Sequence, residues 1–242
     1  EYHFEIATGN YDNRLTFSAG NVPSNTWTHL AVTFSKGNGG ANGTFYGYVN
    51  GEVVYSKTDV ADAAISVSDA SYPLRIGVGS WDVNKFQVDG QIDEVRIWNT
   101  SRTATEIREN MCRTLDGDEN GLVAYYRLNE ASGTTVYDAS SNSNNGTIIG
   151  GATWINSESF NTWLGGTSIA WSTATNWTDG VPISTDNVGI YKWEGNNEAT
   201  ISGSPTVNSL VISSTSTPTL SSGITVNGNL LLEKNINLNG QT

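Results

Sequence analysis

The sequence has little positive charge and almost no cysteine, and each shortage excludes a class of protein. Among its 242 residues, 12 Lys and Arg stand against 24 Asp and Glu, so the formal net charge is −12 at pH 7. Because affinity for phosphate backbones comes mainly from Lys and Arg, we expect no nucleic-acid partner. The single cysteine, Cys112, excludes an internal disulfide framework. No apolar run approaches the roughly 20 residues needed to cross a bilayer, so we expect no membrane insertion.

What the chain does contain is typical of strands and turns. It has 26 Gly, 8 Trp and 10 Tyr, it is rich in Asn, Ser and Thr, and only 15% of its residues are charged. Thr and aromatic residues favour strands, whereas Asn and Gly favour turns. The composition therefore predicts an all-β, extracellular protein. The chain opens inside a strand-like run and stops equally abruptly, so we expect it to be a piece of a longer protein.

Three local patterns predict individual elements. Asn50 and Gly51 separate two apolar-rich runs, which is typical of a tight β-hairpin turn. Residues 74–78 have the composition of a further strand. Thr103, followed three residues later by Glu106, forms a capping box and predicts a helix over 104–111. Such a helix is too short to be stable alone, so we expect it to lie against a sheet.

The pattern changes after about residue 155. Trp163, Trp171 and Trp177 lie close together, and we expect them to form a core rather than an exposed aromatic patch. From residue 199 onward, very short apolar runs alternate with stretches rich in Ser, Thr or Asn-Gly. Runs this short favour the narrow core of a β-solenoid over a sandwich strand, and the alternative is another small β domain. We therefore predict two domains, residues 1–157 and residues 158–242, the second truncated at its C-terminus.

Four segments of the first part follow one another in a recognisable order. They are WTHLAVT (27–33), YVNGEVV (48–54), LRIG (74–77) and GQIDEVRIWN (90–99). In this order they resemble laminin-G-like domains, which are concanavalin A-like jelly rolls, a class that includes lectins, pentraxins and some glucanases. The resemblance covers roughly residues 1–154 and implies a jelly-roll sandwich. Such domains usually begin with several earlier strands, which are either missing here or replaced by residues 122–129, a segment that resembles an opening strand.

The second part is similar to modules of large surface adhesins that gliding bacteria export by the type IX secretion pathway. The similarity is carried by a pattern of Trp, Gly, Pro and Asp residues between Trp163 and Val188, followed by short β repeats. Together, the two resemblances imply a secreted or cell-surface bacterial protein built from many modules.

A jelly-roll glucanase is the sharpest enzymatic hypothesis. Those enzymes carry two glutamates four positions apart on one strand, with an aspartate between them. In the nearest stretch here, Gln91 and Val95 occupy the two glutamate positions. Glu94 has the wrong parity unless a bulge intervenes, and only Asp93 and Glu94 would then remain. The two histidines and Cys112 have no catalytic partner in the sequence, so we expect no catalytic residues and no enzymatic activity.

Calcium is the cofactor that the Asp- and Asn-rich composition favours, because this ion takes several oxygen ligands. The best candidate ligands are Asp116, Asp118 and Asn120, which match the first half of an EF-hand loop. Arg127 stands where the bidentate Glu of that loop is required, so a plain acidic turn explains the run about equally well. Asp138 and the asparagines after it are open to the same two interpretations, with Asx turns favoured.

For sugar recognition, the best candidates are Trp81, Asp82 and Asn84. An aromatic ring can stack on the face of a sugar, and neighbouring amide and carboxylate groups can bind its hydroxyls. These residues lie where the resembled pentraxins hold calcium, although Gly79 and Ser80 stand in place of the acidic cluster of those proteins. The alternative is that Trp81 packs beneath its own loop.

These observations favour a non-catalytic adhesion module at the bacterial cell surface that binds glycans or other extracellular surfaces beside further modules of the same chain. One alternative is the accessory carbohydrate-binding region of a secreted polysaccharide-degrading enzyme. A third is a purely structural spacer.

Overall fold

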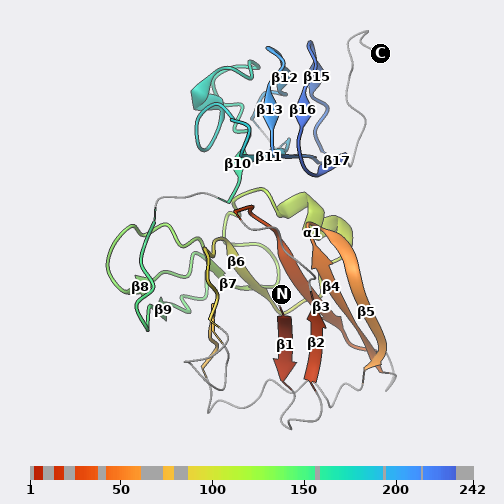
Figure 1. The fold of residues 1–242 in the computed structure, drawn as a ribbon, viewed down its shortest axis with the longest axis vertical. Helices are drawn as coiled ribbons and strands as arrows, with labels where there is room; N and C mark the ends of the chain where they lie inside the picture. Colours follow the sequence, from red (N-terminus) through yellow and green to blue (C-terminus); the bar gives the residue numbers. More distant parts are fainter. Residues whose placement is uncertain are drawn as a thin grey trace. The chain divides into compact units, whose positions relative to one another are not determined.

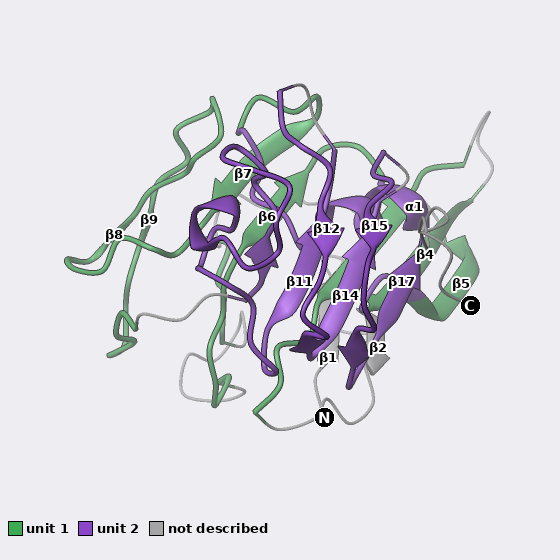
Figure 2. Ribbon diagram, turned by 90° about the horizontal axis from the view of Figure 1, so that it is seen from above, with its two compact units in different colours: residues 1–49, 53–101, 117–155 green, residues 50–52, 102–116, 156–242 purple. Residues whose placement is uncertain are grey.

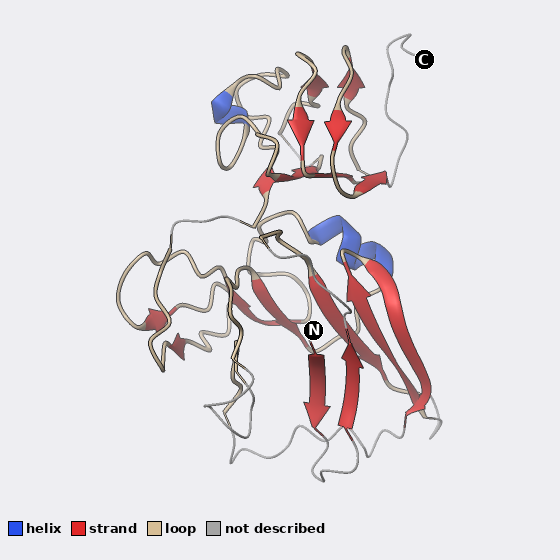
Figure 3. Cartoon of the chain, in the orientation of Figure 1, coloured by secondary structure: helices blue, strands red, loops and turns tan. Residues whose placement is uncertain are grey.

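The computed structural model describes residues 3–7, 14–18, 25–37, 42–60, 73–78, 87–155, 159–192, 195–213 and 215–232. Short β-strands dominate this part of the chain, together with the α-helix α1 (Ala104–Asn110) and the 3-10 helix η2 (Ala174–Asn176) (Figure 1, Figure 3). The predicted all-β class with one short α-helix is confirmed. None of the helices in these ranges has both the length and the hydropathy that a membrane crossing requires.

The chain forms two compact units, which Figure 2 shows in different colours. Unit 1 contains residues 1–49, 53–101 and 117–155, and unit 2 contains residues 50–52, 102–116 and 156–242. This division differs from the two predicted domains because residues 102–116, which lie between strands of unit 1 in the sequence, group with unit 2. The helix thus belongs to a different unit from the one that its sequence position indicated.

Unit 1 is made of antiparallel strands. Its described strands are β1 (His3–Ala7), β2 (Arg14–Ser18), β3 (Leu30–Ser35), β4 (Gly43–Val49), β5 (Glu52–Val60), β6 (Val95–Trp98), β7 (Leu122–Tyr126), β8 (Thr135–Val136) and β9 (Gly146–Thr147). They pair as β1 with β2, β3-β4-β5 in one sheet, β6 with β7, and β8 with β9. The central strand β4 buries Phe45 and Tyr48 almost completely. The β4–β5 turn has φ angles of 49° at Asn50 and 77° at Gly51, both positive as the predicted hairpin requires.

Two sequence expectations for unit 1 have different outcomes. β7 pairs antiparallel with β6, so residues 122–126 supply a strand beside β6 and support the alternative in which this segment replaces an opening strand. Residues 73–78 form no strand, so that prediction is wrong. Gly77 has a φ of 82°, which interrupts an extended run, and Leu74 remains 68% exposed.

The helix α1 begins at the predicted capping box. The backbone N–H of Glu106 donates to the Thr103 hydroxyl at 3.2 Å, and the Thr103 backbone N–H donates to the Glu106 carboxylate at 2.8 Å. These two bonds satisfy donors that the first turn of a helix leaves free. The capping box and the position of the helix are therefore confirmed.

Unit 2 consists mainly of short strands that pair in parallel. They are β10 (Asn161–Thr162), β11 (Asn187–Ile190), β12 (Thr200–Ile201), β13 (Thr206–Val207), β14 (Ser209–Ile212), β15 (Thr219–Leu220), β16 (Thr225–Val226) and β17 (Leu230–Leu232). The sheets are β10-β11-β14-β17, β12-β15 and β13-β16. Because each strand pairs in register with a strand one turn later in the chain, unit 2 is a β-solenoid, as predicted.

The solenoid interior is apolar and closely packed. Val188, Ile190, Ile201, Val207, Leu210 and Ile212 are fully buried. Trp163, Trp171 and Trp177 join the same core, and the Trp163–Trp177 and Trp171–Trp177 ring pairs meet edge to face at 4.9 and 4.6 Å. These tryptophans are therefore core residues, as expected, and not a binding patch.

Leu210 allows a direct test of the solenoid core. Its side chain is fully buried, whereas Leu230, its partner one turn later, is 53% exposed. We expect Leu210→Ala to lower the free energy of unfolding by about 2–5 kcal/mol, because it leaves a cavity. The matched Leu230→Ala should cost well under half as much. Urea denaturation followed by tryptophan fluorescence measures both, and equal losses would contradict the burial of Leu210 in the solenoid core.

Candidate functional site

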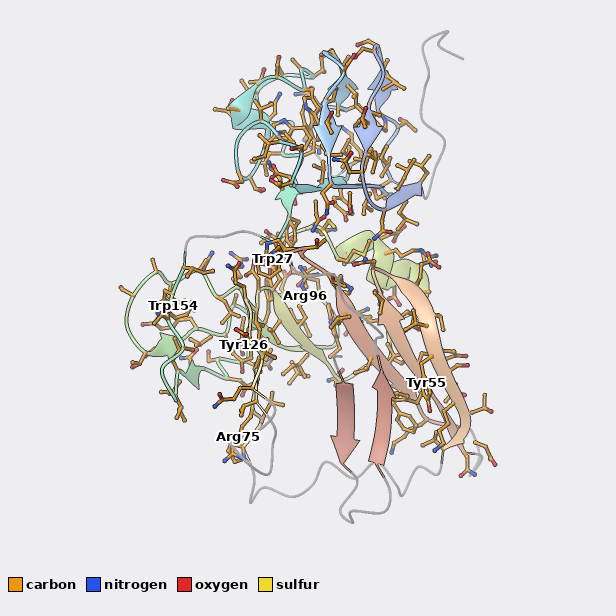
Figure 4. The ribbon with its side chains drawn as sticks, viewed as in Figure 1. Trp27, Tyr55, Arg75, Arg96, Tyr126 and Trp154 are labelled. Atoms are coloured by element: carbon orange, nitrogen blue, oxygen red, sulfur yellow. The ribbon has the colours of Figure 1, made fainter. Side chains whose placement is uncertain are left out.

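One face of the β6–β7 pair carries a cluster of charged and aromatic side chains. Arg96 on β6 lies opposite Tyr125 on β7, so both side chains occupy the same face of the pair, and Arg127 follows two positions later. Figure 4 labels Arg96 and, next to Tyr125 in the chain, Tyr126. Glu94 has a left-handed φ of 55° just before β6 begins. This local irregularity brings its carboxylate to Arg96, two residues away.

The contacts within this cluster are short. The Arg96 guanidinium lies 2.7 Å from Oε2 of Glu94, and the Tyr125 hydroxyl donates to the same oxygen at 2.5 Å. The guanidinium groups of Arg96 and Arg127 each lie 5.3 Å from the centre of the Tyr125 ring, within cation–π range. Tyr125 itself is fully buried. The cluster is therefore a mostly enclosed ionic network rather than an open pocket.

This environment shifts two ionisable groups. Burial raises the pKa of Glu94, although Arg96 and the Tyr125 hydrogen bond act in the opposite direction. Burial also lowers the pKa of His29 from 6.5 to about 4, and the positive charge of Arg96 adds to that effect. His29 is therefore neutral at pH 7, next to a cationic side chain.

The same geometry bears on the glucanase hypothesis. Asp93 accepts a hydrogen bond from the Glu94 backbone N–H at 3.0 Å, and the Glu94 carboxylate is held by Arg96 and Tyr125. A retaining glycosidase needs two carboxyl groups on either side of a sugar, about 5 Å apart. The two acidic residues that the sequence offered are instead used within the local structure.

Asp138 organises the loop that follows β8. Its Oδ1 accepts from the backbone N–H groups of Tyr125 and Ser140 at 2.9 and 2.8 Å. Its Oδ2 accepts from the Ser140 hydroxyl and the Asn144 N–H at 2.9 and 2.8 Å. Burial alone would raise the pKa of Asp138, but these donors outweigh it and lower the pKa. Both oxygens are thus occupied by protein donors, which supports the Asx-turn interpretation over calcium.

The acidic turn at residues 116–121 has a different character. Asp116, Asp118 and Asn120 are exposed, whereas the Glu119 carboxylate folds back to accept from the Gly117 backbone N–H at 2.9 Å. The Gly117 carbonyl accepts from Ser141 N–H at 3.2 Å. Throughout the described part of the chain, no three His, Cys, Asp or Glu side chains group together to hold a metal ion.

The predicted sugar-binding residues Trp81, Asp82 and Asn84 lie outside the described residues. The structure does describe residues on either side of them. The Val88 N–H donates to the Gly77 carbonyl at 2.9 Å, so the intervening segment starts and ends at adjacent points of unit 1.

The ionic cluster is the feature that sequence analysis missed. Glu94, Arg96, Tyr125 and Arg127 all occur in segments that carry the laminin-G resemblance, but nothing local indicates that they meet. The one local signal is that Tyr125 and Arg127 are two positions apart, which is the spacing of residues on one face of a strand.

Residues 1–108 match the family model of the Concanavalin A-like lectin/glucanases superfamily. This match confirms the laminin-G-like resemblance for that region of the chain. No curated protein matches the sequence. Among solved structures, the chain is similar to a “putative carbohydrate binding protein from Bacteroides ovatus ATCC 8483”, with 27% identity and a TM-score of 0.45. The likeness covers 60% of this chain and 39% of that one, so this chain spans about two fifths of that protein.

The neutral His29 predicts how stability depends on pH. Its pKa is about 4 in the folded chain and about 6.5 when unfolded, so the unfolded state binds the extra proton between these values. We therefore expect the free energy of unfolding to fall as pH drops from about 6.5 to 4, by at most about 3 kcal/mol from this residue.

Chemical denaturation at several pH values, compared between wild type and His29→Gln, isolates this contribution. Glu94, whose raised pKa acts in the opposite direction, titrates in both proteins and cancels in the difference. Parallel stability–pH curves for the two proteins would contradict the assignment.

Proposed function

We propose that this chain is a non-catalytic carbohydrate-binding and adhesion segment of a large secreted bacterial surface protein. The observation that carries the proposal is the match of residues 1–108 to a superfamily of lectins and glucanases, in a chain whose candidate catalytic glutamate is otherwise engaged. A lectin-like role needs an exposed recognition loop on a stable scaffold, and it needs no paired carboxylates.

The chemistry of Glu94 supports a non-catalytic role. A carboxylate nucleophile or general acid must reach the substrate, whereas Glu94 is mostly enclosed and hydrogen-bonded to Arg96 and Tyr125. Breaking these contacts to free the carboxylate would leave the Arg96 charge poorly compensated in a site with little solvent. The cluster is therefore assigned a structural role, joining β6 to β7.

We assign sugar recognition to Trp81, Asp82 and Asn84. The hydrogen bond between Val88 and Gly77 supports this assignment, because it closes the base of the segment that carries them. An aromatic ring beside amide and carboxylate groups matches the alternating apolar faces and hydroxyl edges of a pyranose. Single contacts of this kind are weak, so binding in the whole protein depends on several modules acting together.

A glycan array tests this assignment. The full chain, multimerised through a tag, should bind a defined set of glycans, and Trp81→Ala should lower the signal by at least about tenfold through loss of the stacking contact. Tyr137→Ala is the matched control, because Tyr137 is an aromatic residue that is 60% exposed elsewhere in unit 1.

Binding that survives Trp81→Ala would move the site to another surface. If the multimerised wild type binds no glycan at all, the chain is a structural spacer. The accessory-region alternative predicts the same array result and is distinguished by a catalytic domain in the adjoining sequence.

Calcium remains a proposed cofactor at the turn of Asp116, Asp118 and Asn120. These three residues are exposed, and their side chains carry the oxygen atoms that this ion prefers. Because few acidic groups converge there, backbone carbonyls and water would have to complete the coordination shell, which implies weak binding.

Isothermal titration of the full chain with calcium chloride measures this site. We expect weak one-to-one binding that is reduced at least about tenfold in the double variant Asp116→Asn, Asp118→Asn, because both anionic ligands are lost. Asp179→Asn, which removes an exposed carboxylate elsewhere, is the control. Absence of a heat signal, or equal binding by the double variant, would exclude calcium at this turn.

The proposed location is the bacterial cell surface, reached by type IX secretion, with other modules of the same chain as neighbours. The lectin-like superfamily and a composition rich in Asn, Ser, Thr and Gly support an extracellular site.

A further inference from the structure

The parallel sheet of the solenoid has an unusual outer face. On β14, Leu210 and Ile212 face the solenoid interior, so Val211 between them faces outward, yet Val211 is only 2% exposed. On the other sides of the solenoid the outward positions are threonines, such as Thr200 and Thr206. The sequence therefore makes one outer face apolar and the others polar, which indicates that this face is covered.

The cover comes from residues 102–116, here named the strap. The strap contains α1 and the turn after it, and α1 contacts β14. Met111 and Cys112 of the strap form a buried cluster with Phe160, Tyr191 and Val211, and Leu231 packs against it. In Figure 2, α1 accordingly has the colour of unit 2.

Polar contacts fix the position of the strap. The Thr162 hydroxyl donates to the Cys112 carbonyl at 2.9 Å, at a buried position on β10. The Arg113 guanidinium lies 5.9 Å from the centre of the Tyr191 ring. These contacts attach the strap to β10 and to the residue that directly follows β11.

The glycine at position 189 shows how closely the strap approaches β11. It lies at an outward position of β11, between the interior residues Val188 and Ile190. A Cβ atom at this position would overlap the Cys112 carbonyl oxygen and the Tyr191 ring, and would lie 3.1 Å from Cβ of Cys112. Its φ is not in the left-handed region, so the backbone there accepts any residue. The need for glycine therefore comes from the close approach of the strap backbone and of the neighbouring Tyr191 ring.

We propose that the strap is a built-in lid of the solenoid, and that unit 2 keeps its stable packed state only while residues 102–116 are docked on its outer face. The consequence is that the folding unit at the C-terminal end is discontinuous in sequence. It depends on a segment that enters from between β6 and β7, where a boundary drawn near residue 157 would remove it. This inference stands independently of any ligand.

The single cysteine gives a direct readout in the intact chain. Cys112 is 8% exposed and belongs to the strap interface, so its reaction rate with a thiol reagent under native conditions reports how often the strap opens. Gly189→Ala should dislodge the strap, raise the labelling rate by about tenfold or more, and lower the urea midpoint seen by the solenoid tryptophans. The matched control is Gly223→Ala, where an added Cβ meets nothing within 4 Å and φ is not left-handed.

A second variant keeps the test decisive if Gly189→Ala does not fold. Met111→Ala keeps good helix propensity but removes packing from the same interface, and we expect the same two changes at smaller size. If either folded variant matches Gly223→Ala in both labelling rate and tryptophan midpoint, the docked strap does not stabilise the solenoid and the proposal is overturned. Faster labelling with an unchanged tryptophan midpoint would also overturn it, because the solenoid would then be stable without its lid.

Discussion

The hydrogen bonds that Arg96 and Tyr125 donate to a single oxygen of Glu94 are the interaction on which the functional account depends. They join the start of β6 to β7, the strand that residues 122–126 supply beside it. They also occupy the carboxylate that would otherwise be the most plausible catalytic group of a glucanase-like sheet. Because a mostly buried arginine needs its counter-ion, the site is stable only while Glu94 remains in place. The same contacts therefore stabilise unit 1 and keep this carboxylate mostly buried and hydrogen-bonded.

Unit 2 depends instead on apolar packing. β14 is buried on both sides, because Leu210 and Ile212 face the solenoid interior while Val211 meets the strap. Ordinary solenoid strands need one apolar face and one polar face, and β12, β13, β15 and β16, which carry outward threonines, follow that rule. A narrow interior supplies limited burial, so a second layer on one outer face adds apolar contact to the sheet that contains the longest strands of unit 2, β11 and β14. The two units thus use different constraints, an ionic network in unit 1 and a double apolar layer in unit 2.

Local sequence rules correctly predicted the features that depend only on neighbouring residues. The hairpin at Asn50 and Gly51 and the capping box of Thr103 and Glu106 each depend on backbone conformations within four residues. Residues 74–78 were predicted as a strand from composition, and the left-handed Gly77 prevents it. The solenoid was predicted from short apolar runs, although its clearest signal, the recurrence of Thr206-Val207-Asn208 as Thr225-Val226-Asn227, became evident only with the strand register. Tyr125, which binds Glu94, and the residues that pack against the helix lie far away in sequence, and no local pattern identifies them.

The central claim is that this chain recognises carbohydrate without cleaving it. The most direct measurement incubates the full chain with insoluble bacterial and plant polysaccharides, then quantifies bound protein and released oligosaccharides from the same tube. The account predicts retention of the protein on at least one polysaccharide with no soluble sugar above the buffer control. Release of oligosaccharides that disappears in Glu94→Gln would contradict it, since the buried carboxylate would then be a catalytic group.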